Sequence, residues 1–322
     1  MGNGGLVFAF AFRGGSRQAA SDFAEAAAAA ANADFLWVHL DLGDAAAQAW
    51  LRARPWPANV IEIVAAPIQR GKLFINSELI YGHLRDFRYA PGDSLQAGSL
   101  SVVVSQRLLV TGRRIPLRSI GELRRRVESQ TVRPANPYGL ITEFFKALND
   151  IGEDQLQKAG EHLRSMESKV LKRIGAEHRE EILEMRRDSI EIVRDMTYKR
   201  TALLDWVREQ PSVLPRDEYE RLNHQIHRYA ALVEDAQEFA DQCQFVLEEL
   251  RAQVEEKTSR NLYILTAFSV IFLPATLVAS IWGMNVGGLP FSDNPHGFIV
   301  VGGLIAATSI AVLLFLFRFR FF

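Results

Sequence analysis

The chain has 322 residues, with 37 basic and 38 acidic side chains and a formal net charge of −1 at pH 7. No strongly basic segment is present, so we expect no nucleic-acid partner. The single cysteine, Cys243, excludes an intrachain disulfide and a CxxC metal site. The near-neutral average conceals a highly charged region, roughly residues 140 to 260, that precedes an almost charge-free tail.

Residues 1–133 are predicted to form an α/β domain. Short β-branched or alternating runs between turn residues are typical of strands, and Ala-rich or amphipathic runs are typical of helices. The expected strands cover 36–42, 73–75, 78–84, 100–104 and 108–111, and the expected helices cover 23–33, 45–53 and 117–129. The apolar run 6–12 is too short for a signal peptide and lacks a cleavage site.

Residues 134–260 are predicted to be almost entirely helical. Apolar residues recur near helical spacing from Ile141 to Val170, and a second helix is expected over 177–209, before the breakers Pro211 and Pro215. No further breaker follows until Pro274, so we expect a third helix of about 65 residues that continues into the membrane. A helix of this length requires coiled-coil-like or oligomeric support.

The third helix carries an apolar seam at heptad spacing, which we expect to pack against the two preceding helices. The seam comprises Leu222, Ile226, Tyr229, Val233, Ala236, Ala240, Cys243, Leu247, Leu250 and Val254.

The tail, residues 261–322, contains two uncharged apolar stretches, 262–282 and 298–317. Each has about 20 residues, enough for a helix to cross the hydrocarbon of a bilayer. Basic residues flank the two stretches on their outer sides, whereas the connecting loop 283–297 has no Lys or Arg; the flanking residues are Lys257, Arg260, Arg318 and Arg320. By the positive-inside rule, both termini are cytoplasmic and the loop is external.

Polar residues in the first apolar stretch are confined to one stripe at 3-4 spacing. The stripe comprises Ser259, Leu262, Thr266, Ser269, Leu273, Thr276 and Ser280. One interpretation is hydrogen bonding between helices or to the helix's own backbone; the other is the wall of a narrow, mildly polar pore. One chain cannot enclose a water path, so a pore requires a homo-oligomer. The second stretch has small residues that permit close helix packing, namely Gly302, Gly303, Ala306 and Ala307.

Extending the stripe toward the N-terminus gives an acidic face on the long helix. Its carboxylates are Glu234, Glu238, Asp241, Glu248 and Glu255. Such a face either concentrates cations by focusing the electric field or is an ordinary solvated surface. His224 and His227, three residues apart, are candidate zinc ligands or incidental surface histidines.

The first stretch ends at Gly283-Met284-Asn285, which we take as candidate selectivity residues. A ring of Asn285 side chains, one per subunit, would present neutral amide oxygens to a hydrated divalent cation. The alternative is a helix C-cap, where glycine and asparagine are common. The residues alone leave both interpretations open.

Gly-Met-Asn at the end of the first of two terminal spans resembles the CorA superfamily of divalent-cation transporters. Phe272-Leu273-Pro274-Ala275-Thr276 upstream and Trp37-Val38-His39-Leu40 near the N-terminus strengthen the resemblance. It implies an α+β membrane protein of the bacterial inner membrane and a homopentamer whose residues 134–260 form a cytoplasmic funnel. It also implies an axial metal path along the polar stripe to Asn285, with Leu262 and Leu273 as constrictions.

Residues 283–291 (GMNVGGLPF) are most similar to the ZntB zinc-transport branch, because Asp293 is the one acidic residue in the loop. Members of that branch often lack the methionine that is kept here as Met284. The implied cargo is Zn²⁺, with Mg²⁺, Co²⁺, Ni²⁺ or Cd²⁺ as alternatives, and no bound cofactor is expected. A membrane-anchored sensor or scaffold is a lesser alternative. No Walker, HExxH or GxSxG motif indicates an enzyme.

Overall fold

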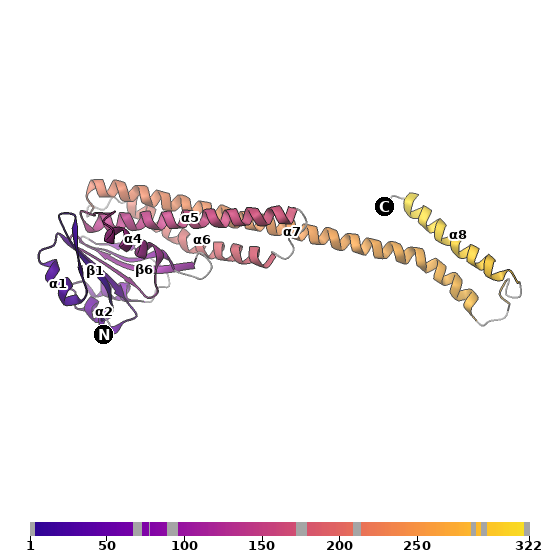
Figure 1. The fold of residues 1–322 in the computed structure, drawn as a ribbon, viewed down its shortest axis with the longest axis horizontal. Coiled ribbons are helices and arrows are strands. Elements are labelled where there is room, and N and C mark those ends of the chain that lie inside the picture. The colour runs from indigo at the N-terminus through magenta and orange to yellow at the C-terminus, as the bar shows by residue number, and fades with distance from the viewer. Residues whose placement is uncertain are drawn as a thin grey trace. The chain divides into compact units, whose positions relative to one another are not determined.

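The computed structural model describes residues 4–66, 73–76, 78–88, 96–171, 179–208, 214–284, 288–290 and 295–318 (Figure 1). The chain divides into two compact units, Met1–Leu247 and Glu248–Phe322. The predicted boundaries after residues 133 and 260 follow composition, and they stay a prediction.

The first unit is built on a mixed sheet whose described strands lie in the order β2-β1-β3-β7-β6-β5-β4. The strands are β1 (Leu6–Arg13), β2 (Ser16–Ala20), β3 (Phe35–Asp41), β4 (Leu73–Ile75), β5 (Ile80–Arg88), β6 (Gln96–Val104) and β7 (Leu108–Arg113). Among them β3 and β7 pair in parallel, and the other neighbours pair antiparallel. The five predicted strands are therefore confirmed as β3 to β7, although the ends of β5 and β6 extend beyond the prediction.

Helices cover both faces of the sheet (Figure 1). One buried apolar cluster joins the sheet to α1 (Phe23–Ala30), α2 (Ala45–Arg52) and α3 (Ala58–Ala65). A second cluster joins the other face to α4 (Arg118–Glu128), α5 (Pro137–Leu171) and α7 (Arg216–Gly283). The three predicted helices correspond to α1, α2 and α4, whereas α3 was not predicted.

Strand β1 shows why the prediction missed part of the sheet. Phe8, Phe10 and Phe12 belong to the cluster with α4 and α5, whereas Ala9 and Ala11 belong to the cluster with α1 to α3. Side chains of a strand alternate between faces, so both faces of β1 are buried. Such a strand is a continuous apolar run, without the alternation that indicates a half-buried strand.

The Trp-Val-His-Leu segment lies on β3 in the centre of the sheet. Its Trp37 indole N–H donates to Thr111 Oγ1 on β7 at 2.9 Å, and His39 Nδ1 lies 2.8 Å from the same oxygen. Burial, with smaller contributions from Arg113 and Arg124, lowers the pKa of His39 to about 3. The imidazole is therefore neutral and serves the packing of the sheet.

Three long helices follow the sheet: α5, α6 (Arg179–Arg208) and α7, which has 68 residues. The predicted long helix of about 65 residues is confirmed. All the seam residues from Leu222 to Leu250 are buried, and Val254, in the second unit, is exposed. Full burial of a Leu or Ile side chain contributes about 1.5 to 3 kcal/mol, so the seam is a major source of stability for the first unit.

A chain of ion pairs connects α4, α5 and α7. Arg228 of α7 binds Asp150 at 2.8 Å and Glu153 at 2.6 Å, both on α5. Arg126 of α4 binds Asp150 at 3.0 Å and Glu122 at 2.8 Å. Partial burial would raise the pKa of Asp150, but hydrogen bonds from the two arginines outweigh it and lower that pKa. Asp150 therefore stays ionised as the junction of the network.

Asp86 on β5 caps a helix that is distant in sequence. The residue before α4, Leu117, offers no side-chain cap. The fully buried Asp86 carboxylate instead accepts hydrogen bonds from the backbone N–H groups of Ser119 at 2.9 Å and Ile120 at 3.1 Å. These groups have no partner within the helix. Burial nevertheless dominates and raises the pKa of Asp86 from 3.8 to about 6.

We expect the Asp86→Asn variant to lose a pH-dependent part of the stability. Because the folded state binds the Asp86 proton more tightly than the unfolded state, its contribution to the free energy of unfolding falls as the pH rises from about 4 to 6. The fall is at most about 2 to 3 kcal/mol. Thermal unfolding of the detergent-solubilised protein between pH 4 and 7.5 measures this, and parallel profiles for wild type and Asp86→Asn would contradict it.

Candidate functional site

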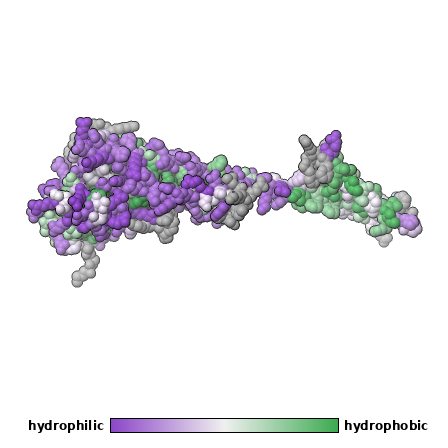
Figure 2. Space-filling model, turned by 45° about the horizontal axis from the view of Figure 1, so that its top comes forward, coloured by the Kyte–Doolittle hydropathy of each residue, from purple (hydrophilic) through white to green (hydrophobic). Residues whose placement is uncertain are grey.

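Among the residues that the structure describes, two helices are long and apolar enough to span a membrane: α7, through its C-terminal part, and α8 (Gly297–Arg318). Their apolar side chains are exposed in the single chain, Leu273 at 69% and Phe298 at 90%. Figure 2 shows the resulting apolar surface on the second unit. A surface of this kind requires lipid or other protein to cover it.

The predicted polar stripe lies along α7 and is exposed over its full length, from Ser259 to Ser280. Its hydroxyl groups donate to the backbone carbonyl four residues earlier. Thr266 donates to Leu262 at 2.8 Å, Ser269 donates to Leu265 at 2.9 Å, and Thr276 donates to Phe272 at 2.8 Å. Backbone satisfaction, one of the two interpretations of the stripe, therefore accounts for these three donors.

This hydrogen bonding is compatible with a pore wall. A hydroxyl group has one donor and two acceptor lone pairs. When Thr266 or Thr276 donates to its own helix, the oxygen keeps acceptor capacity for a ligand, and it offers no competing positive hydrogen. Such a surface suits the water shell of a cation better than that of an anion. The stripe can thus be satisfied in the single helix and still be chemically suited to conduct cations.

Pro274 lies inside α7, next to Leu273 of the stripe. Proline has no backbone N–H, so the carbonyl of Val270 lacks the partner that a regular helix would provide four residues later. A free carbonyl in hydrocarbon is costly unless it meets water or another polar group. Pro274 therefore adds an oxygen acceptor to the middle of the span, a contribution that the prediction did not include.

The Gly283-Met284-Asn285 motif lies where α7 ends. Gly283 is the last residue of the helix, and Met284 follows with its side chain 54% exposed. Asn285, the predicted selectivity residue, lies outside the described residues. The Trp282 indole N–H donates to the Pro290 carbonyl at 3.1 Å, which ties the end of the span to the loop. Trp282 and Pro290 are eight residues apart, and no sequence pattern predicted this contact.

The predicted acidic face is exposed at all five carboxylates, from Glu234 to Glu255. Arg200 of α6 binds Glu234 at 3.0 Å and offsets its charge. Glu238 accepts a hydrogen bond from Gln242 at 3.3 Å, which leaves its charge intact. That this face attracts cations stays a prediction.

His224 and His227 are both exposed on α7. The part of the chain that the structure describes holds no group of three or more His, Cys, Asp or Glu side chains placed to bind a metal ion. Zinc sites in proteins use three or four protein ligands. The two histidines thus lack a third protein ligand within the described residues of the single chain, and their role as ligands stays a prediction.

Comparisons to known proteins identify the family of this chain. The model of the CorA-like Mg2+ transporter protein family matches residues 32–320. The chain belongs to this family. It is therefore a divalent-cation transporter in a membrane, and it is not an enzyme.

Two curated relatives show how the chain compares within this group. It is 24% identical over 277 residues to the divalent cation transporter CmaX of Pseudomonas aeruginosa, covering 84% of this chain and 83% of the relative. It is also 24% identical over 280 residues to the zinc transport protein ZntB of Pectobacterium atrosepticum, covering 83% and 84%. Equal identity to both means that similarity alone does not select a metal.

Two solved structures share the fold. Full-length CmaX has a TM-score of 0.81 at 22% identity and covers 99% of both chains. The CorA magnesium transporter of Methanocaldococcus jannaschii has a TM-score of 0.81 at 16% identity and covers 97% of both chains. The α/β domain, long helix and two terminal helices are therefore a known arrangement.

We expect Trp282→Phe to loosen the loop after the first span. Phenylalanine keeps the apolar ring and lacks the indole N–H that reaches the Pro290 carbonyl. Hydrogen–deuterium exchange of the full-length protein should show faster exchange of the amides between residues 284 and 290, by several-fold, with α8 unchanged. Unaltered exchange in the loop would show that this contact does not order it.

Proposed function

We propose that the chain conducts divalent metal cations, with zinc favoured, across the bacterial inner membrane through the axial pore of a homopentamer lined by α7. The observation that carries the proposal is the polar stripe of the first span, which ends at Gly-Met-Asn in a chain of the CorA-like family. An anchor has no need to confine every Ser and Thr of a span to one face. A conduction path does.

The oligomer follows from the stripe. Two helices cannot surround a water-filled path, so several copies must bring α7 together about an axis. Gly302 and Gly303 on α8 permit close approach of a neighbouring helix, which suits α8 to an outer position. The family resemblance supplies the number five. In this arrangement the exposed apolar side chains of the single chain face other subunits or lipid.

The proposed path has alternating chemistry along its length. Thr276, Ser269 and Thr266 offer hydroxyl oxygens to a hydrated cation, whereas Leu273 and Leu262 form apolar constrictions that can gate by dewetting. At the external mouth, the amide oxygens of an Asn285 ring replace part of the outer hydration. Neutral oxygens bind a divalent ion weakly enough to release it, as conduction requires.

The external loop after the first span favours zinc as the cargo. Asp293 is its one acidic residue, so little negative charge surrounds the mouth to hold a strongly hydrated Mg²⁺. This feature and the similarity to the Pectobacterium ZntB favour zinc. Magnesium or cobalt is the second candidate, because Met284 keeps the full motif and the family model is named for Mg2+.

The proposed orientation places both termini in the cytoplasm. Lys257 and Arg260 precede the first span and Arg318 follows the second, whereas the loop of residues 283–297 has no basic residue. The chain has no nucleotide-hydrolysis motif, so the proposed driving force is the metal gradient, the membrane potential or a proton gradient.

Uptake into dye-loaded proteoliposomes tests the function. Wild-type protein should admit Zn²⁺, and Asn285→Ala should reduce the rate at least about tenfold while the oligomer stays intact on size-exclusion chromatography. Asn294→Ala, in the same loop outside the motif, is the matched control and should retain the rate. Faster flux of Mg²⁺ than of Zn²⁺ would reassign the cargo, and no flux of either would refute transport through this chain.

Cysteine accessibility tests the path itself. In a Cys243→Ser background, Thr276→Cys in the assembled protein should react with a small cationic thiosulfonate reagent, because the stripe faces water. Thr308→Cys on α8 is the matched control, since Thr308 makes the same backbone hydrogen bond to Leu304 at 3.0 Å. It should react at least about tenfold more slowly because hydrocarbon surrounds it. Equal protection of both thiols would make the stripe a packing face.

A further inference from the structure

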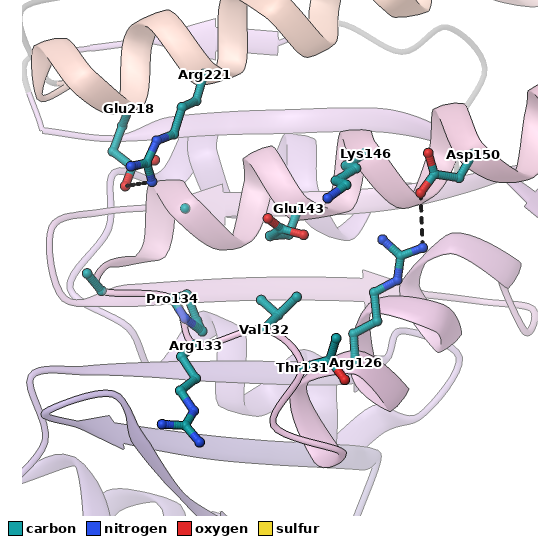
Figure 3. A pocket seen from close by; sticks show the side chains of 12 residues that line it. Arg126, Thr131, Val132, Arg133, Pro134, Glu143, Lys146, Asp150, Glu218 and Arg221 are labelled. Atoms are coloured by element: carbon teal, nitrogen blue, oxygen red, sulfur yellow. Dashed lines mark hydrogen bonds and ion pairs between the residues drawn. The ribbon is translucent and has the colours of Figure 1, made fainter.

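A polar cavity of about 510 Å³ lies within the first unit, where the loop after α4, one face of α5 and the start of α7 meet (Figure 3). The volume falls in the range of small-molecule sites, about 300 to 1,000 Å³. Its lining comes from two distant stretches of sequence, residues 126–150 and 218–221, so no sequence motif indicated it. The transport path proposed above uses none of these residues.

Local structure brings the first turns of α5 and α7 together at the cavity. Asn136 precedes Pro137, the first residue of α5, and its Oδ1 accepts a hydrogen bond from the Gly139 N–H at 2.8 Å. This is the usual side-chain cap with proline at the first helical position. The Asn136 amide also donates to Glu218 Oε1 of α7 at 3.2 Å. One residue thus fixes both helix starts, whose free N–H groups carry partial positive charge.

Four cationic side chains line the cavity (Figure 3). Arg126 is engaged by Glu122 and Asp150. Lys146, exposed on α5, makes no ion pair with any residue that the structure describes. The remaining two, Arg133 and Arg221, make a hydrogen bond to Gln130 at 3.3 Å and a long ion pair with Glu218 at 3.9 Å. Three cations are therefore available to bind an anionic group.

Two carboxylates of the cavity have an oxygen without a donor. Glu218 is 8% exposed, and its Oε2 is buried with no hydrogen-bond partner among the described residues. Glu143 Oε2 is also buried and has no hydrogen-bond partner among the described residues. A buried carboxylate oxygen is costly to leave unsatisfied, so a donor from a ligand would stabilise both side chains. Asp150, the third carboxylate, is already occupied by Arg126 and Arg228.

We infer that this cavity binds a phosphorylated sugar, free or as the sugar phosphate of a nucleotide. The phosphate binds Lys146, Arg133 and Arg221, and the sugar hydroxyls donate to Glu143 and Glu218. Carboxylates are common acceptors for sugar hydroxyls, and Arg and Lys are common phosphate ligands. Inorganic phosphate offers fewer hydroxyl donors to these two acceptors than a sugar phosphate does.

A metal ion fits this cavity less well than a sugar phosphate does. The four cations repel it, and the described residues supply no cluster of three or more acidic or histidine ligands. A sugar phosphate also contacts α5 and the first turn of α7 at once. Its binding would stabilise their packing and give a regulatory input to the helix that carries the polar stripe.

Isothermal titration calorimetry of the detergent-solubilised full-length protein tests the inference. The probes are ribose 5-phosphate, AMP, inorganic phosphate and ribose. We expect saturable binding of ribose 5-phosphate or AMP, and Lys146→Met should weaken it about tenfold or more. Lys146 is exposed, so this variant should keep its melting temperature. Lys158→Met, also exposed on α5 and outside the cavity, should bind like wild type.

A second variant tests the sugar-binding carboxylate separately from the phosphate-binding cations. Glu143→Gln removes the carboxylate acceptor, so it should weaken ribose 5-phosphate about tenfold without weakening inorganic phosphate. No saturable binding of any probe up to millimolar concentration would overturn the inference. Equal affinity of Lys146→Met and wild type would also overturn it, as would inorganic phosphate binding as tightly as ribose 5-phosphate. Flux is not measured, so the outcome is independent of the proposed transport.

Discussion

The structure depends on one continuous helix that must satisfy two different environments. In the first unit, α7 buries Leu222, Ile226 and Tyr229 in the same cluster as the sheet and α5. In the membrane-spanning part of the second unit, none of the residues of the same helix is buried in the single chain. The hydrophobic effect in water drives the burial of these side chains in the first unit. In the hydrocarbon of a membrane, the backbone polar groups must form hydrogen bonds within the segment. A helix is the element that meets both demands without a break.

The chemistry of the span rests on how hydroxyl groups are used. Thr266, Ser269 and Thr276 donate to their own backbone, which removes the penalty of polar groups in hydrocarbon. Because the hydroxyl hydrogens are used in these bonds, each hydroxyl oxygen presents only its acceptor lone pairs to the surroundings. Hydroxyl groups that are satisfied within their own helix are therefore compatible with the proposed cation path. Whether the stripe conducts cations depends on what faces it, and in the proposed oligomer that is the pore axis.

Charge in the first unit is placed by burial and by partners. Asp86 is held fully buried by the N–H groups at the start of α4, and His39 is kept neutral in the sheet. In contrast, Asp150 is stabilised as a carboxylate by two arginines that link α4 to α7. The cavity beside this network has the opposite character, because Oε2 of Glu143, Oε2 of Glu218 and the Lys146 ammonium have no partner among the residues that the structure describes. Ion-paired side chains therefore lie beside a cavity in which several charged groups have no partner among the described residues.

The sequence by itself determined the helical regions, two spans, polar stripe and family resemblance, because each depends on local periodicity or a short motif. It missed β1, whose two buried faces erase the alternation of a strand, and it also missed β2 and α3. Only the tertiary structure decided that Asp86 caps α4, that Arg200 offsets Glu234 and that two distant stretches of sequence form the polar cavity. These are contacts between residues far apart in the chain, and periodicity along a sequence carries no information about which distant side chains the fold brings together.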